Sequence, residues 1–64
     1  MTNSTERRYM VCRFSYTARV MWRVWDLRDA RYVETIRAEE GLTDFRTEGS
    51  AQDTADYLNA MQAV

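Results

Sequence analysis

The sequence contains no histidine, no lysine and no proline, and it has only one cysteine and two glycines. Histidine is the usual general base and a common zinc ligand near neutral pH, so its absence removes the most frequent catalytic and zinc-binding arrangements. The single Cys12 cannot form an internal disulfide; we interpret it as a small buried apolar residue, with a reactive thiol as the less favoured alternative. No glycine-rich phosphate loop is present either. The sequence therefore predicts no enzyme, no cofactor and no metal site.

The chain also lacks a long apolar run, a linker rich in proline or serine, and an internal repeat. Its 64 residues support one domain with one modest core. We expect a single domain spanning 1–64, in which the polar segment 1–6 is disordered. Neither a transmembrane helix nor a signal peptide is predicted, so we expect a soluble protein in the cytoplasm.

Positive and negative charges are nearly balanced, with nine arginines, ten acidic residues and a formal net charge of −1. Such a chain has no bulk attraction for nucleic acid or anionic lipid. We attribute the exclusive use of arginine to a GC-rich coding sequence, and selection for recognition of phosphate or carboxylate is the alternative. We assign the acidic pairs at 39–40, 53 with 56, and 26 with 29 to a loop, a helix surface and a turn.

Three runs of strand-forming residues indicate an antiparallel sheet. They cover Tyr9–Phe14, Arg19–Trp25 and Arg31–Arg37. The turn at 26–30 has an aspartate near each end, whose carboxylates can accept hydrogen bonds from nearby backbone N–H groups. The turn at 15–18 has no glycine, asparagine or aspartate, so its type stays open. The sequence predicts a three-stranded antiparallel meander.

Pairing the second and third runs across their turn sets the register of the predicted sheet. It places an arginine opposite a glutamate and aromatic side chains opposite one another, which favours this register over its neighbours. The predicted pairs are Trp22 with Thr35, Arg23 with Glu34, Val24 with Val33, Trp25 with Tyr32, and Met21 near Ile36.

A polar loop at 39–44 follows, and Phe45–Arg46 either adds a short fourth strand or lets Phe45 fill the core. Thr47 or Ser50 can cap the amino end of a C-terminal helix. The apolar stripe of this helix is narrow and rich in alanine, which suits close packing against a sheet with bulky residues. The stripe contains Ala51, Ala55, Leu58 and Met61 or Gln62, flanked by Tyr57 and Val64. The predicted fold class is therefore α+β, a meander covered on one face by one helix.

Side chains alternate along strands, so the predicted sheet has two apolar faces. Face one carries Tyr9, Val11, Val20, Trp22, Val24 and Val33. Face two carries Met10, Cys12, Phe14, Met21, Trp25, Tyr32 and Ile36, with Arg23 and Glu34 in its middle. We assign the helix to face one because an ion pair is costly to cover with a lean alanine stripe. In the alternative, the sheet curls and Tyr57, Phe45 and the loop shield face two.

Large apolar surfaces are uncommon on monomers, so an open face two indicates a partner. The predicted function is a small non-enzymatic interaction or regulatory protein that self-associates as a homodimer or binds a host protein, with no membrane partner. The alternative is a nucleic-acid-binding module that stacks bases on the same face beside Arg8, Arg19 and Arg23. The predicted interface residues are Met10, Phe14, Met21, Arg23, Trp25, Tyr32 and Ile36.

Between Trp22 and Asn59 the chain resembles a group of small uncharacterised open reading frames of actinobacteria and their phages. Their pattern is a W-x-V-x-D hairpin, then F-x-T and an alanine-rich helix ending in Leu-Asn. The matching residues are Trp22, Val24, Asp26, Val33, Phe45, Thr47, Ala51, Ala55, Leu58 and Asn59. Ala30, where a turn glycine is usual, and Gly49 depart from it. The resemblance implies a hairpin-plus-helix fold and an actinobacterial or phage origin, with a location in the host cytoplasm if a phage encodes the protein. It implies no activity or ligand.

Overall fold

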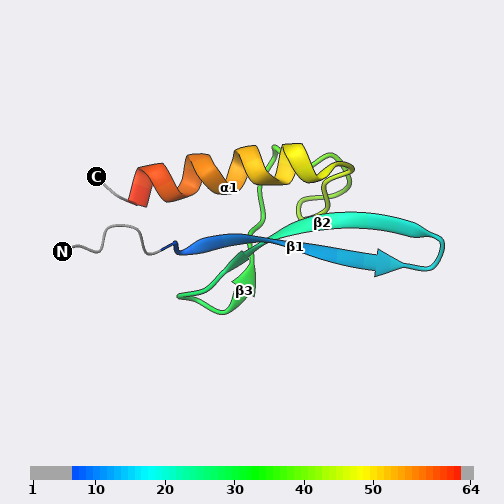
Figure 1. Ribbon diagram of the computed structural model, residues 1–64, viewed down its shortest axis with the longest axis horizontal. Coiled ribbons are helices and arrows are strands. Elements are labelled where there is room, and N and C mark those ends of the chain that lie inside the picture. The colour runs from blue at the N-terminus through cyan, green and yellow to red at the C-terminus, as the bar shows by residue number, and fades with distance from the viewer. Residues whose placement is uncertain (1–6, 63–64) are drawn as a thin grey trace.

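Figure 1 shows the computed structural model, which describes residues 7–62. The strands form one antiparallel sheet in the order β1-β2-β3, and a helix follows them. The sheet and helix confirm the predicted α+β meander. The expected disordered segment 1–6 and the helix-flanking Val64 lie outside the described residues. The elements are β1 (Tyr9–Tyr16), β2 (Arg19–Asp26), β3 (Arg31–Tyr32) and α1 (Glu48–Gln62).

β1 and β2 form a long hairpin closed by a two-residue turn. Tyr16 pairs with Arg19, so only Thr17 and Ala18 lie between the strands. Thr17 has a φ of 52°. A positive φ at the first central residue is the pattern of a type II′ turn, whose twist matches that of paired strands. The tight turn lets both strands run farther than predicted, and the tip of the hairpin projects beyond the helix in a molecule 43 Å long.

The third strand keeps the predicted register but is shorter than predicted. Tyr32 pairs with Trp25, and the Val33 N–H donates a 2.9 Å hydrogen bond to the Val24 carbonyl, which confirms the alignment after the turn. β3 nevertheless ends at Tyr32, whereas the prediction extended the strand to Arg37. After Val33 the chain leaves the sheet.

The edge of β2 beside Trp22 is occupied by the segment that precedes the helix. The Trp22 N–H donates to the Phe45 carbonyl over 3.0 Å, and the Phe45 N–H donates to the Trp22 carbonyl over 2.7 Å. Phe45 is also 0% exposed, so it combines the two predicted roles of strand contact and core residue. Thr35 instead donates its N–H to the Leu42 carbonyl. Because Phe45 takes this edge, the predicted pairs Trp22–Thr35, Arg23–Glu34 and Met21–Ile36 are wrong.

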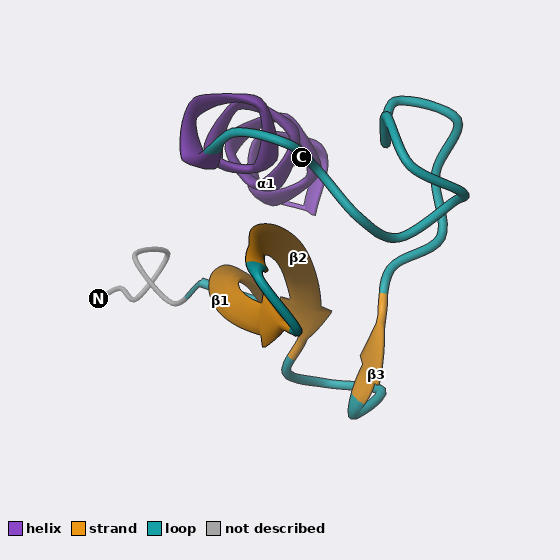
Figure 2. Ribbon diagram, turned by 90° about the vertical axis from the view of Figure 1, so that its right-hand side faces the viewer, coloured by secondary structure: helices purple, strands orange, loops and turns teal. Residues whose placement is uncertain are grey.

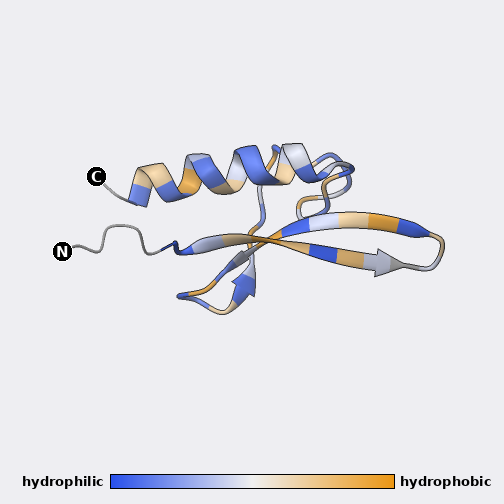
Figure 3. Ribbon diagram, in the orientation of Figure 1, coloured by the Kyte–Doolittle hydropathy of each residue, from blue (hydrophilic) through white to orange (hydrophobic). Residues whose placement is uncertain are grey.

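The helix begins after Thr47, one of the two predicted caps. The Thr47 Oγ1 accepts a hydrogen bond from the Ser50 N–H, and the Thr47 carbonyl accepts one from the Ala51 N–H. These contacts satisfy N–H groups that have no partner within the first turn. Ala51 and Ala55 are buried as predicted, whereas Met61 is 57% exposed, so the apolar stripe ends before the last turn. Figure 3 shows the helix alternating between hydrophilic and apolar segments, as expected when one side meets a sheet.

The core lies between the helix and face one of the sheet, as predicted. The view along the hairpin shows the helix on one side of β1 and β2, while β3 curves away from the opposite side (Figure 2). Small alanine side chains let the helix approach bulky strand residues closely. The fully buried apolar residues are Val24, Phe45, Ala51 and Ala55, with Tyr9, Val11, Trp22, Val33, Ala38 and Leu58 packed around them.

Candidate interaction surfaces

Face two of the sheet carries a row of stacked side chains that we call the aromatic strip. The Arg23 guanidinium lies 3.9 Å from the centroid of the Phe14 ring and 4.9 Å from that of Tyr32. Tyr32 also meets Trp25 edge to face, with ring centroids 4.9 Å apart and planes at 74°. Such contacts hold the rings in place, so the strip is a preformed surface. It consists of Met10, Phe14, Arg23, Trp25 and Tyr32.

The positive charge within the strip is neutralised by Asp44, not by the predicted Glu34. The Arg23 Nε donates to the Asp44 Oδ1 over 2.5 Å, and both side chains are about four-fifths buried, with relative exposures of 20% and 22%. This hydrogen bond raises the pKa of Arg23 and lowers the pKa of Asp44. Asp44 is adjacent to Phe45, whose bonds to Trp22 bring the loop against β2. The strip is therefore aromatic and overall neutral.

Five of the seven predicted interface residues lie together in this strip. Met10 and Tyr32 are 38% and 37% exposed, respectively. Met21 alternates onto the same face but is only 4% exposed, so it offers little surface to a partner. Ile36 is 92% exposed, but it follows the point where the chain leaves the sheet. We therefore leave Met21 and Ile36 out of the strip.

Arg8, predicted to belong to a nucleic-acid surface, instead holds the end of the hairpin together. Its Nε and one terminal nitrogen each donate 2.9 Å hydrogen bonds to the carboxylate of Asp26, which is 3% exposed. Asp26 also accepts hydrogen bonds from the N–H groups of Arg28 and Asp29. The Arg8 hydrogen bond is the main reason that the pKa of Asp26 is lowered to about 2. Arg8 further contacts the side chains of Asp29 and Gln62.

Asn59 was given no role by strand and helix patterns, yet it joins the helix to β1. Its Oδ1 accepts hydrogen bonds from the N–H groups of Arg8 (3.0 Å) and Tyr9 (2.9 Å), and its Nδ2 donates to the Tyr9 carbonyl (3.0 Å). The amide thus occupies the place of a neighbouring strand at Tyr9. The only hint in the sequence is that Leu58 and Asn59 belong to the pattern of the predicted resemblance.

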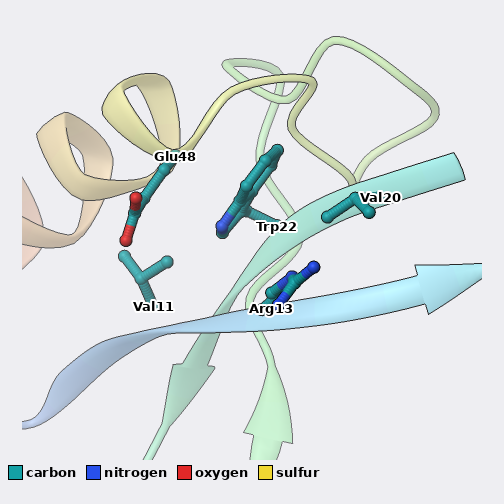
Figure 4. A pocket seen from close by; sticks show the side chains of 5 residues that line it. All are labelled: Val11, Arg13, Val20, Trp22 and Glu48. Atoms are coloured by element: carbon teal, nitrogen blue, oxygen red, sulfur yellow. The ribbon is translucent and has the colours of Figure 1, made fainter.

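An open groove lies on face one beyond the start of the helix (Figure 4). It encloses about 480 Å³. Glu48 reaches down from the helix beside Val11, while Trp22 rises from β2. Trp22 was assigned to the core, but it is only partly buried, because the helix starts too late to cover the outer half of the hairpin. The groove is lined by Val11, Arg13, Val20, Trp22 and Glu48.

Residues 7–62 contain no group of histidine, cysteine, aspartate and glutamate side chains placed to hold a metal ion. Within the same residues, no helix has the length and apolar character needed to cross a membrane. Comparisons with protein-family models, with curated proteins and with solved structures found no match to this chain. The two surfaces described above are therefore the basis for the functional proposals.

Proposed function

We propose that this chain is a non-enzymatic interaction protein that self-associates through its aromatic strip. The observation that carries the proposal is the one-sided packing of the helix. α1 contacts β1 and β2 through face one, whereas on face two Met10 and Tyr32 stay 38% and 37% exposed. The strip on that face presents a Trp25–Tyr32 pair and a stacked arginine. Tryptophan, tyrosine, methionine and arginine are the residues enriched at the centres of protein interfaces.

A second copy of the chain is the simplest occupant of the strip. A two-fold contact buries the same strip twice, and the strip's own charges suit this arrangement. Arg23 keeps Asp44 as its partner, so association does not leave an uncompensated charge in the interface. The Phe14 and Tyr32 contacts of Arg23 also reduce the side-chain entropy that binding would remove.

The nucleic-acid alternative has less support because its arginines are already paired. Arg23 binds Asp44, Arg8 binds Asp26, and the Arg19 guanidinium lies 3.6 Å from the Glu40 carboxylate. A phosphate backbone would have to compete with these carboxylates, and the net charge of −1 supplies no compensating attraction. A host-protein partner, an actinobacterial or phage origin and a cytoplasmic location remain predictions from the sequence.

Light scattering after size-exclusion chromatography, at low micromolar concentration, tests the proposal. We expect twice the chain mass of 7.6 kDa for the unaltered protein and a folded monomer for Trp25→Glu. The matched control is Met61→Glu, which places the same charge on an exposed helix residue on the other side of the sheet and should remain dimeric. A monomer at every concentration would refute self-association. An increase in mass only after addition of single-stranded DNA or RNA would favour the alternative.

A further inference from the structure

We propose that the outer edge of β1, from Val11 to Ser15, binds an extended segment of a partner protein as an additional antiparallel strand, with an acidic residue of that segment opposite Arg13. β1 is the first strand of the sheet and has a strand neighbour only in β2. Such an edge presents backbone N–H and C=O groups to any chain that can align with it. This inference goes beyond the proposed function, because it uses the outward backbone groups and the face-one side chains of β1, whereas the aromatic strip uses side chains of face two.

The hydrogen-bond pattern of the hairpin identifies which backbone groups point outward. In an antiparallel pair every second residue directs both of its backbone groups to the partner strand. The Leu27 N–H donates to the Arg8 carbonyl, and Tyr16 and Arg19 form the pair that closes the two-residue turn. The backbone N–H and C=O groups of the even-numbered residues of β1 therefore point toward β2. The outward residues are Tyr9, Val11, Arg13 and Ser15.

Only the first of these outward residues is satisfied within the described chain. The Asn59 side chain bonds both the N–H and the C=O of Tyr9, as an adjacent strand would. No hydrogen bond from residues 7–62 reaches the backbone groups of Val11, Arg13 or Ser15 on that edge. Asn59 thus closes one end of the edge and leaves the following stretch open.

The groove on face one provides a surface for the side chains of an added strand. Val11 and Arg13 belong both to the open edge and to the lining of the groove (Figure 4). An antiparallel strand aligned with them would place alternate side chains on face one, next to Val11 and Arg13. The open backbone and the groove lie next to each other, so one extended segment could use both.

Charge identifies the occupant of this edge. Arg13 is exposed and has no ion-pair partner within residues 7–62, so an acidic residue directly opposite it would form a favourable cross-strand pair. Glu48 lies beside Val11, where an apolar residue of the partner fits better than a second acid. A second copy of β1 fits poorly. If two copies paired antiparallel along the whole stretch from Val11 to Ser15, the Arg13 side chains of the two copies would lie opposite each other, and like charges in that position repel.

The probe for this proposal is a capped heptapeptide, Thr-Val-Thr-Asp-Thr-Val-Thr, with its aspartate opposite Arg13 and its valines opposite Val11 and Ser15. We expect its addition to slow hydrogen exchange, measured by NMR, at the amides of Val11, Arg13 and Ser15. The amides of Cys12 and Phe14, already bonded to β2, should change little. No protection at millimolar peptide, or protection confined to other residues, would overturn the proposal.

Two matched peptides test whether binding uses strand pairing. In the proposed register the N–H of the central aspartate donates to the Arg13 carbonyl, whereas the N–H of the following threonine points away. N-methylation of the aspartate should abolish binding, and N-methylation of that threonine should be tolerated. Any other pattern would overturn the antiparallel register.

Charge reversal tests the role of Arg13. Arg13→Glu should weaken binding of the aspartate peptide about fivefold and improve binding of the same peptide with a central lysine by a similar factor. Arg31→Glu, which reverses another exposed arginine away from this edge, is the control and should change neither affinity. If Arg13→Glu shows no change of preference, the assigned occupant is wrong. Trp25→Glu should leave peptide binding intact, so failure of the dimer proposal and failure of this one can be told apart.

Discussion

The buried ion pair between Arg8 and Asp26 should make the protein sensitive to acid in a defined pH range. The pKa of Asp26 is lowered to about 2 from an ordinary value of 3.8, because its carboxylate accepts hydrogen bonds from Arg8 and from two backbone N–H groups. A carboxylate with a lowered pKa in the folded state contributes stability above its unfolded pKa. That contribution is lost as the pH falls through the folded value.

The size of this contribution follows from the difference between the two pKa values. A fall from 3.8 to about 2 corresponds to roughly 2.4 kcal/mol at 1.36 kcal/mol per unit, and screening by water at the rim of a small domain reduces this to about 1–2 kcal/mol. A domain of this size has a net stability of only about 3–5 kcal/mol. The loss of the pair alone is therefore a large part of the total.

Urea unfolding of the unaltered protein and of Asp26→Asn at several pH values between 7 and 2 measures this contribution. We expect Asp26→Asn to be less stable by about 2 kcal/mol at pH 7, because the partly buried Arg8 loses its buried charged partner and keeps only the more exposed Asp29. The difference between the two proteins should shrink as the pH falls from about 4 to 2. Other carboxylates with lowered pKa values, such as Asp44, are present in both proteins and cancel in the comparison.

The matched control is Asp29→Asn. Asp29 is the second partner of Arg8, at 3.1 Å, but its side chain is 40% exposed, so its loss should cost well under half as much. A difference between the unaltered protein and Asp26→Asn that stays constant from pH 5 to 2 would refute the assigned role of Asp26.

Three further predictions concern packing and backbone geometry, and each is checked by thermal or urea unfolding. Ala55→Leu should destabilise the protein by about 1–3 kcal/mol, because Ala55 is 0% exposed against the sheet. Ala60→Leu, on the exposed side of the helix, should be nearly neutral, and equal effects would mean that the helix does not pack through its alanine stripe. Ala30→Gly should stabilise by about 0.5–1 kcal/mol because Ala30 has a φ of 54°, while a loss of stability would show that its side chain is needed. Trp22→Glu should cost more stability than Trp25→Glu, because Trp22 packs against the buried core. A larger loss of stability for Trp25→Glu would mean that the helix covers face two and not face one.

The features that the sequence predicts well are those set by neighbours along the chain. Alternation assigned Trp22 and Trp25 to opposite faces, and the turn at 26–30 placed Tyr32 opposite Trp25. The cap at Thr47 and the buried pair of helix alanines likewise depend on spacing within a few residues. In each case one short segment carries all the information needed.

The features that the sequence did not predict depend on contacts between distant segments. The end of β3 is set by Phe45, which returns to β2 and takes the edge beside Trp22. That return also brings Asp44 to Arg23, where local pairing had placed Glu34. Asn59 bonds Tyr9 from 50 residues away along the chain. A polar residue on a helix can form hydrogen bonds with many different groups. Its partner in this structure is determined only by how the helix packs on the sheet.

The residues from which we predicted a resemblance to small actinobacterial and phage reading frames serve folding in this structure. Phe45 and Ala55 are buried, and Thr47 caps the helix. Asn59 bonds the backbone of Tyr9 at the start of β1, and Asp26 bonds the side chain of Arg8, the residue before it. A pattern made of such residues can predict a fold, but it contains no residue that identifies a partner or an activity.

The residues that would select a partner at the two proposed surfaces lie outside that pattern. Arg13 is exposed and forms no ion pair within residues 7–62, yet it is the residue that would select an acidic residue in a strand bound at the β1 edge. Met10 and Tyr32 likewise add exposed surface to face two rather than buried core. In this chain, then, the residues that fix the fold and those that would choose a partner are largely separate. A substitution at Arg13 should therefore change binding preference at little cost to stability. A substitution at Asn59 should lower stability and leave the binding preference unchanged.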